Sequence, residues 1–192
     1  MSTPVLHLLA GSNGAGKSTL ALEILIPRTH LAFVNADFIA ERSWPGDRGE
    51  QARRAADVSQ LAAEDRALLM AQQVSFITET VFSHPSKLDL LRQAQIIGYT
   101  VSLHIVMVPE ALAIERAADR VMYGGHTVPE DKTRGQLGRL WDLVAQARHM
   151  ADRADFYDNS SLDEPFRRVA TYEYGQPVGQ PNWPGWAPSP LT

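Results

Sequence analysis

Residues 11–19 constrain the fold of this chain most, because they read Gly-Ser-Asn-Gly-Ala-Gly-Lys-Ser-Thr and match the pattern G-x-x-x-x-G-K-[ST] in full. The apolar segment 5–10 precedes them, and a helix-like segment, 20–26, follows. A strand, loop and helix with this pattern are typical of a phosphate-binding loop. The sequence therefore predicts that this segment binds a nucleotide.

Each residue type in the loop has a physical role in holding phosphate. Glycine at positions 11, 14 and 16 permits positive φ and close approach, so successive backbone N–H groups can converge on an anion. Lys17 opens the next helix and can reach the terminal phosphates, while the hydroxyl of Ser18 is expected to bind Mg²⁺. The alternative is a glycine-rich turn whose serine only caps the helix. The residues expected to bind the nucleotide are Gly11, Asn13, Gly14, Ala15, Gly16, Lys17, Ser18 and Thr19.

Composition narrows the class of protein further. Of the 192 residues, 44% are hydrophobic, enough for a sizeable core, and the formal net charge is −4. This negative net charge argues against DNA or an anionic membrane as the main partner. A polyanion must therefore be bound at a local site, since the protein as a whole does not attract it. The chain has no cysteine, which excludes disulfides and Cys-ligated zinc, and no apolar run approaches about 18 residues. We expect a soluble, cytoplasmic protein.

Strand-like and helix-like segments alternate along the chain, and Pro27 is expected to end the first helix. Further strands are predicted at residues 31–37, 74–81, 99–108, 154–160 and 168–174. Helices are predicted at residues 49–73, 86–98 and 130–152, and another helix is expected to begin at about Glu110. The helix at 49–73 is expected to pack on the sheet through Val58, Leu61, Ala62, Leu68 and Leu69. This order predicts the α/β fold of P-loop nucleoside triphosphate hydrolases and kinases, a mostly parallel sheet with helices on both faces.

We expect one kinase domain over residues 1–175 and a tail over residues 176–192. The tail contains five prolines together with Trp183 and Trp186. It is predicted to be extended, and either disordered or docked through its tryptophans.

Ligands of such sheets bind outside the carboxyl ends of the strands, so the loop, Asp37, Glu79 and the helix after the fourth strand should meet in one crevice. Asp37 could take a proton from an attacking hydroxyl or hold Mg²⁺ through water; the alternative is a helix N-cap. Glu79 is expected to face the crevice and bind a substrate hydroxyl or amide, because burying it unpaired would be costly. The alternative for Glu79 is a structural ion pair. Asn35 and Thr80, beside these carboxylates, are expected to bind substrate.

Two arginines four residues apart, Arg116 and Arg120, project from one face of the helix after the fourth strand. Two cations on a closing element suit phosphoryl transfer, in which charge spreads over three oxygens. The alternative is a solvated face that pairs with neighbouring acidic residues. The pair Asp158-Asn159, after the fifth strand, is expected to stabilise a turn more than to contact the nucleotide. Arg134 and Arg139 are weaker candidates of the same type as Arg116 and Arg120, while His126 could either bind phosphate or simply fix its loop.

Several motifs together resemble the zeta toxin family of P-loop kinases, over about residues 4–162. They are the loop 11–19, Val34-Asn35-Ala36-Asp37, Thr78-Glu79-Thr80, Gly98-Tyr99, Val108-Pro109, Ile114-Glu115-Arg116, Gly124-Gly125-His126-Thr127-Val128-Pro129 and Tyr157-Asp158-Asn159-Ser160. The resemblance implies that Asp37 is the general base, that Glu79 contacts substrate, and that Arg116 and Arg120 are lid arginines. It also implies ATP and Mg²⁺ as cofactors, and an antitoxin protein as a partner if the chain is a toxin.

The best-known members of that family phosphorylate the sugar 3′-hydroxyl of UDP-N-acetylglucosamine. Those members carry Glu-Gly-Thr where this chain has Glu79-Thr80-Val81, so here the third residue lacks a hydroxyl. The chain is similar to the short members with a Gly-Gly-His motif, for which the family gives no single substrate.

Other classes with a similar loop fit the sequence less well. A partner-coupled P-loop ATPase of the transporter type would carry a Leu-Ser-Gly-Gly-Gln-like signature and an apolar strand that ends in Asp-Glu, and the sequence has neither. A GTPase would carry Asn-Lys-x-Asp, which is also missing. A nucleic-acid kinase could use Arg53, Arg54 and the lid arginines, but the acidic net charge counts against it.

Overall fold

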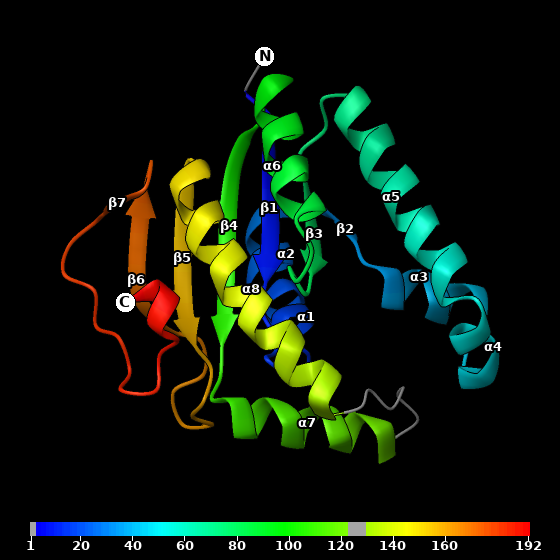
Figure 1. Ribbon diagram of the computed structural model, residues 1–192. Coiled ribbons are helices and arrows are strands. Elements are labelled where there is room, and N and C mark those ends of the chain that lie inside the picture. Colours follow the sequence, from blue (N-terminus) through cyan, green and yellow to red (C-terminus); the bar gives the residue numbers. More distant parts are fainter. Residues whose placement is uncertain (1–2, 123–129) are drawn as a thin grey trace.

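The computed structural model describes residues 3–122 and 130–192, and in this part of the chain one sheet of seven strands forms the centre (Figure 1). The strand order is β2-β3-β1-β4-β5-β6-β7. The strands are β1 Val5–Ala10, β2 Ala32–Val34, β3 Phe76–Thr80, β4 Thr100–Met107, β5 Arg153–Asp158, β6 Arg167–Glu173 and β7 Gln176–Pro177. The first five in sequence pair in parallel, while β6 and β7 pair antiparallel.

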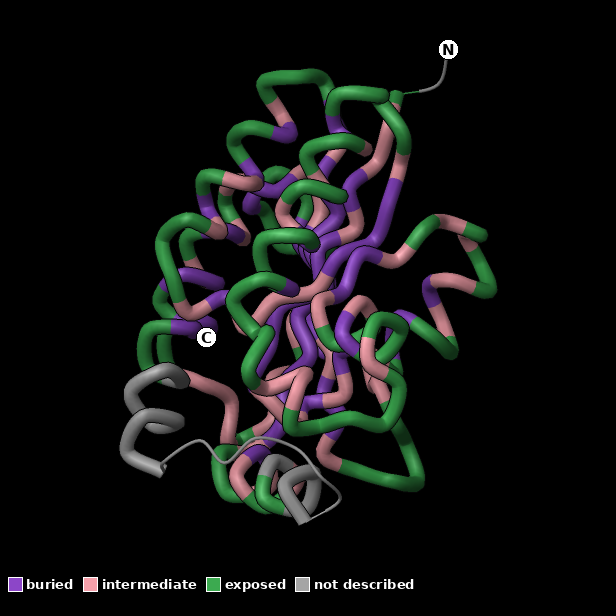
Figure 2. Tube along the Cα trace, turned by 90° about the vertical axis from the view of Figure 1, so that its right-hand side faces the viewer, coloured by how far each residue is buried: buried purple, intermediate pink, exposed green. Residues whose placement is uncertain are grey.

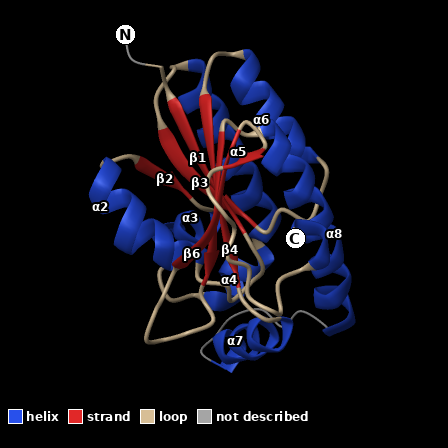
Figure 3. Cartoon of the chain, turned by 90° about the vertical axis from the view of Figure 1, so that its left-hand side faces the viewer, coloured by secondary structure: helices blue, strands red, loops and turns tan. Residues whose placement is uncertain are grey.

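Helices cover both faces of this sheet, which confirms the predicted fold class (Figure 3). They are α1 Lys17–Leu20, the π-helical turn η1 Ala21–Leu25, α2 Ile26–Thr29, α3 Ala36–Ser43, α4 Arg48–Arg53, α5 Ala55–Ala71, α6 Ser86–Ile96, α7 Glu110–Met122, α8 Glu130–Met150 and the 3₁₀ turn η2 Ser189–Leu191. The parallel strands point toward α7, which lies across their carboxyl ends (Figure 1).

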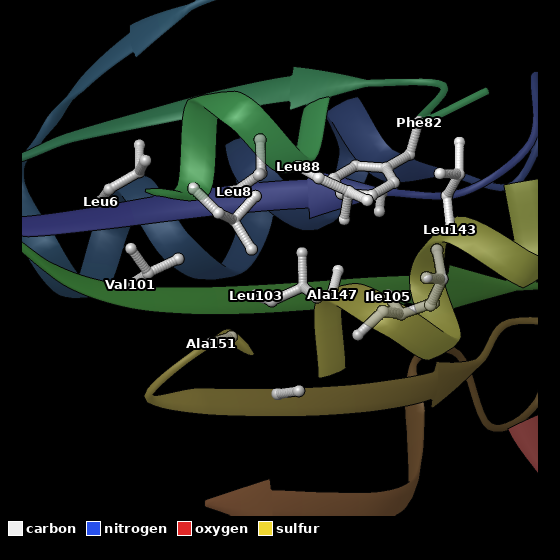
Figure 4. Packing of buried hydrophobic residues seen from close by; sticks show 14 of the residues in the cluster. Leu6, Leu8, Phe82, Leu88, Val101, Leu103, Ile105, Leu143, Ala147 and Ala151 are labelled. Atoms are coloured by element: carbon white, nitrogen blue, oxygen red, sulfur yellow. The ribbon is translucent and has the colours of Figure 1, made fainter. Parts of the chain in front are cut away.

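Alternation along the strands divides the core into two clusters. Leu6 and Leu8 of β1 point to the face covered by α6 and α8, where they meet residues such as Val101 and Leu103 of β4 (Figure 4). Leu9 points to the other face, against Leu20 of α1. In β4 every residue after the first is buried, as predicted for a central strand, and the buried segments gather at the centre of the molecule (Figure 2).

Two of the predicted helix boundaries are wrong. Pro27 does not end the first helix, because the chain passes through one π-helical turn, η1, and then continues as α2 to Thr29. A π-turn widens the helix just where the proline lacks its N–H and would crowd the preceding turn. The predicted helix at 49–73 is two helices, since the backbone of Arg54, with φ −96° and ψ 10°, separates α4 from α5.

Helix α5 packs mainly against α3 at the sheet edge instead of lying on the sheet (Figure 1). Val58 and Ala62 are buried there, but Leu61 and Leu68 of the predicted apolar face are exposed. The physical reason is that β2, the edge strand, has three residues and offers little surface for a helix of 17.

The second strand is also shorter than predicted. It ends at Val34, because the side chain of Asn35 accepts hydrogen bonds from the backbone N–H groups of Asp37 (2.7 Å) and Phe38 (3.2 Å) and so caps α3. Asp37 therefore neither ends a strand nor caps the helix; it lies in the first turn of α3.

The tail after β7 packs onto the domain. Trp183 meets Phe156 of β5 edge to face, with ring centroids 5.1 Å apart. Leu191 is buried, and its carbonyl oxygen accepts a hydrogen bond from Nη1 of Arg148 on α8 at 2.8 Å. Of the two alternatives for the tail, docking through tryptophan is the one observed.

A row of polar side chains crosses the sheet beneath α2. His7 Nδ1 lies 3.0 Å from His104 Nε2, and the hydroxyl of Ser102 lies 3.2 Å from the same nitrogen. Burial, together with repulsion from the ring of His7, lowers the pKa of His104 to about 3. Burial also lowers the pKa of His7, so both rings are neutral when the protein is folded near neutral pH.

These histidines should make the fold sensitive to mild acid. Between the unfolded pKa of 6.5 and the folded value of about 3 for His104, the unfolded chain binds more protons, so stability falls as pH falls. The slope contributed is at most about 1.4 kcal/mol per pH unit for each histidine. Urea unfolding of His104→Gln at about pH 5 and pH 7 should show a smaller pH effect than wild type. A His104→Gln protein that keeps the wild-type slope would contradict this account.

Candidate active site

Glycines shape the loop between β1 and α1, because a side chain at these positions would be strained. Gly11, Gly14 and Gly16 have φ values of 151°, 76° and 98°. A Cβ on Gly11 would lie 2.4 Å from the carbonyl oxygen of Val106, and one on Gly16 would lie 2.5 Å from Nδ2 of Asn159. The loop backbone therefore forms a tight concave turn, which is the shape that presents N–H groups to phosphate.

Lys17 begins α1 and is buried, with 7% of its surface exposed. Its Nζ donates to the backbone carbonyl of Ser12 at 2.9 Å, which holds the ammonium across the loop. The hydroxyl of Ser12 is buried and has no hydrogen-bond partner among the described residues. A buried cation at a helix N-terminus, beside an unsatisfied hydroxyl, fits a polyphosphate better than an empty turn.

A cavity of about 420 Å³ opens above this loop, at the carboxyl ends of β1 and β3. Its size is that of a small-molecule site. Most of the loop lines it together with Asp37, Glu79 and Arg116, so the crevice predicted from the order of strands exists. Gly11 and Ala15, also predicted to bind the nucleotide, are buried and do not line the cavity. The full lining is Asn13, Gly14, Gly16, Lys17, Ser18, Thr19, Asn35, Ala36, Asp37, Glu79, Thr80, Val81 and Arg116.

Glu79 is held by the loop itself. It lies on β3 opposite Leu9 of β1, and its Oε2 accepts a hydrogen bond from the hydroxyl of Ser18 at 2.8 Å. Asp37 is exposed to the cavity from the first turn of α3. A hydroxyl and two carboxylates are the oxygen donors that Mg²⁺ takes in nucleotide sites, so these three side chains fit the expected ion.

The other two residues predicted to bind substrate have local partners. The side-chain oxygen of Asn35 caps α3, while its Nδ2 is buried without a partner among the described residues. The Oγ1 of Thr80 accepts a hydrogen bond from the backbone N–H of Phe82 at 3.2 Å. Both residues line the cavity, and each also forms a hydrogen bond that supports the nearby backbone.

Arg116 reaches the cavity from α7, where its Nη1 donates to the backbone carbonyl of Asn159 at 3.1 Å. Arg120 lies on α7 by its backbone, but its side chain is outside the described residues. The same holds for Arg134 on α8, and the segment 123–129 with His126 lies outside them altogether. Arg139 is exposed on α8.

Asn159 is predicted from the sequence to stabilise a turn, but it also lies against the phosphate-binding loop, a contact that was not predicted. Its Nδ2 donates to the carbonyl of Ala15 at 2.9 Å, and both groups are buried. Its neighbour Asp158 is fixed by Arg167 and by the backbone N–H of Ser160. Burial alone would raise the pKa of Asp158, but these hydrogen bonds outweigh it and lower the pKa. The available signal was an asparagine just beyond a parallel strand, at the edge where ligands bind.

Comparison with known proteins places the chain in a family. The model of the zeta toxin family matches residues 1–162. The chain belongs to the zeta toxin family. This confirms the resemblance drawn from the motifs. Comparison with curated proteins gives no significant sequence match.

Solved structures share the fold of this zeta toxin family member. The AvrRxo1-ORF1:AvrRxo1-ORF2 complex with sulphate ions is 16% identical, with 92% of this chain and 60% of that chain covered and a TM-score of 0.71. The PezAT chromosomal toxin-antitoxin system of Streptococcus pneumoniae is 16% identical, with 89% and 72% covered and a TM-score of 0.65. A gluconokinase from Sinorhizobium meliloti is 18% identical, with 86% and 87% covered and a TM-score of 0.51. The chain thus spans about 60% of the length of the first of these relatives.

Family and fold together bear out the predicted family and the predicted α/β fold, with its phosphate-binding loop between β1 and α1. Among the described residues, no helix is both long and apolar enough to cross a bilayer.

Replacing Lys17 tests the function of the loop. Lys17→Ala should lower ATP turnover by at least about 10²-fold, because it removes the cation closest to the reacting phosphates. The variant should stay folded by circular dichroism, since the strands are unaffected. Arg92→Ala, which removes an exposed arginine of α6, is the matched control and should turn over ATP like wild type. Equal turnover in Lys17→Ala and wild type would show that this loop is not the nucleotide site.

Proposed function

We propose that this protein is an ATP- and Mg²⁺-dependent kinase that transfers the γ-phosphate to a hydroxyl of a small metabolite. The observation that carries the proposal is the shared cavity, in which the phosphate-binding loop, Asp37, Glu79 and Arg116 all face one space. A hydrolase needs a positioned water, whereas two carboxylates opposite the phosphate site suit a hydroxylated acceptor.

Each of the residues that line the cavity has its own role in the proposed phosphoryl transfer. The oxygen of the acceptor hydroxyl attacks the γ-phosphorus while Asp37 takes the proton of that hydroxyl. The bond between the γ-phosphorus and the bridging oxygen breaks, and this oxygen leaves with ADP. Lys17 and Arg116 stabilise the negative charge that spreads over the transferring phosphoryl oxygens. When bound, Mg²⁺ neutralises charge on the β- and γ-phosphates, and Ser18 would hold it.

Glu79 can serve the same reaction in two ways. The family resemblance gives it a contact to the substrate. Its hydrogen bond to Ser18 favours a second role, because a carboxylate that accepts from this hydroxyl orients the hydroxyl oxygen toward the metal position. In either role its negative charge would lie near the Mg²⁺ that Ser18 would hold.

For the acceptor we propose a nucleotide sugar, with UDP-N-acetylglucosamine as the first compound to test. Family membership supports this class. The cavity presents the carboxylates of Asp37 and Glu79 as acceptors for sugar hydroxyls, while Val81 offers an apolar contact where other members have a hydroxyl. An antitoxin protein is the proposed partner, by analogy with the toxin-antitoxin system named for one structural neighbour.

The acceptor is identified by following label from ATP. Incubation of the protein with γ-³²P-ATP and a cell extract should place ³²P on a small hydroxylated metabolite, which mass spectrometry then identifies. Asp37→Asn should lose this transfer while ATP binding persists, because only the proton acceptor is removed. Asp89→Asn, an exposed carboxylate of α6, is the control and should behave like wild type. Label released only as free phosphate, at one rate with and without extract, would instead favour a partner-coupled ATPase.

The charge clamp is tested separately from binding. Arg116→Ala should lower kcat by about 10²-fold with little change in ATP affinity, because the guanidinium acts on charge that develops in the transition state. Arg92→Ala removes an exposed arginine of α6 and should leave kcat unchanged. An unchanged kcat in Arg116→Ala would instead support the alternative, in which this residue only forms ion pairs on a solvated face.

A further inference from the structure

We propose that Asn159 is a positioning residue for phosphoryl transfer, which sets the loop backbone and Arg116 at the same time. The inference rests on the proposed function only in requiring that the loop hold a nucleoside triphosphate. Asn159 directly follows β5 and is 9% exposed.

Every hydrogen-bonding group of Asn159 is engaged by a different part of the chain. Its backbone N–H donates to the carbonyl of Met107 at 2.9 Å, which fixes it to the end of β4. Its Oδ1 accepts from the backbone N–H of Phe166 at 3.4 Å. Its Nδ2 donates to the carbonyl of Ala15, and its own carbonyl accepts from Arg116. Asn159 thus joins β4, the phosphate-binding loop and α7.

The contact to Ala15 sets the direction of a phosphate-binding group. The carbonyl of Ala15 and the N–H of Gly16 belong to one peptide plane, and in a trans peptide they point in opposite directions. Asn159 holds that carbonyl at 2.9 Å on the buried side of the loop, whereas Gly16 lines the cavity. The Gly16 N–H is therefore turned toward the site where the phosphate would lie.

Glycine at position 16 is part of the same arrangement. A Cβ there would lie 2.5 Å from Nδ2 of Asn159 and 3.5 Å from the ring of Phe166. The absence of a side chain at Gly16 is what lets the amide approach the loop closely enough to bond Ala15.

The contact to Arg116 positions a charge without neutralising it. The acceptor is a backbone carbonyl, which carries no formal charge, so this bond orients the guanidinium at the cavity while its positive charge is kept. A carboxylate in the same place would cancel much of the charge that the transition state needs. Asn159 in this way couples the orientation of Arg116 to that of the loop.

Asn159→Asp tests the amide with the least change in shape, because it keeps the Oδ1 acceptor but replaces the donor to Ala15 with a carboxylate oxygen, which also adds a negative charge. The affinity for a non-hydrolysable ATP analogue with Mg²⁺, measured by calorimetry, should fall at least about tenfold. Once the acceptor substrate is identified, kcat for phosphoryl transfer to it should also fall. Asn159→Ala removes the donor without adding charge, and should lose affinity in the same direction. All proteins are compared at a temperature where circular dichroism shows each one folded.

The matched control is Asp158→Asn, which breaks the ion pair to Arg167 in the same turn. It should lower the free energy of unfolding but keep the wild-type affinity for the ATP analogue. If both Asn159 variants keep the wild-type affinity, Asn159 only stabilises the turn and the proposal is overturned. A wild-type protein that binds the analogue but phosphorylates no acceptor would count against the kinase proposal while leaving the calorimetric test intact.

Discussion

The close approach of the loop backbone to the strands beneath it is the constraint on which the rest of the site depends. At Gly11 the carbonyl of Val106 occupies space that any side chain would need, and at Gly16 the amide of Asn159 does the same. These contacts fix a turn whose peptide groups cannot relax into a helix or an extended strand. The N–H groups of that turn, together with the start of α1, then form a fixed local positive potential in a chain whose net charge is −4.

The parallel sheet supplies the remaining groups through its topology. Since β1 lies between β3 and β4, the carboxyl ends of the neighbouring strands deliver Glu79 and the start of α7 to the same edge. Asp37 comes from one strand further out, through the capped start of α3. Each side chain is thereby held by a regular element, and its distance from the loop is set by strand pairing instead of by a long flexible segment.

Much of this arrangement could be predicted from the sequence because it is encoded locally. The loop motif fixes the phosphate site, and the apolar run of β4 marks the centre of the sheet. The predictions were wrong where a single side chain or a neighbouring element determines the local backbone structure. Whether Asn35 extends β2 or caps α3 depends on two hydrogen bonds, and Pro27 is tolerated through a π-turn that no periodicity reveals. The role of Asn159 depends on a contact between residues 144 positions apart, and the local sequence shows only that an asparagine follows a parallel strand.

The most direct test of the account is a crystal structure of the protein with Mg²⁺ and a non-hydrolysable ATP analogue. The account predicts that the β-phosphate lies within hydrogen-bonding distance, about 3 Å, of the backbone N–H groups of Gly16 and Lys17. It also predicts that the Lys17 ammonium contacts the phosphates and that Asp37 faces the γ-phosphate. A triphosphate bound elsewhere on the molecule, or one that leaves these N–H groups without contact, would contradict it.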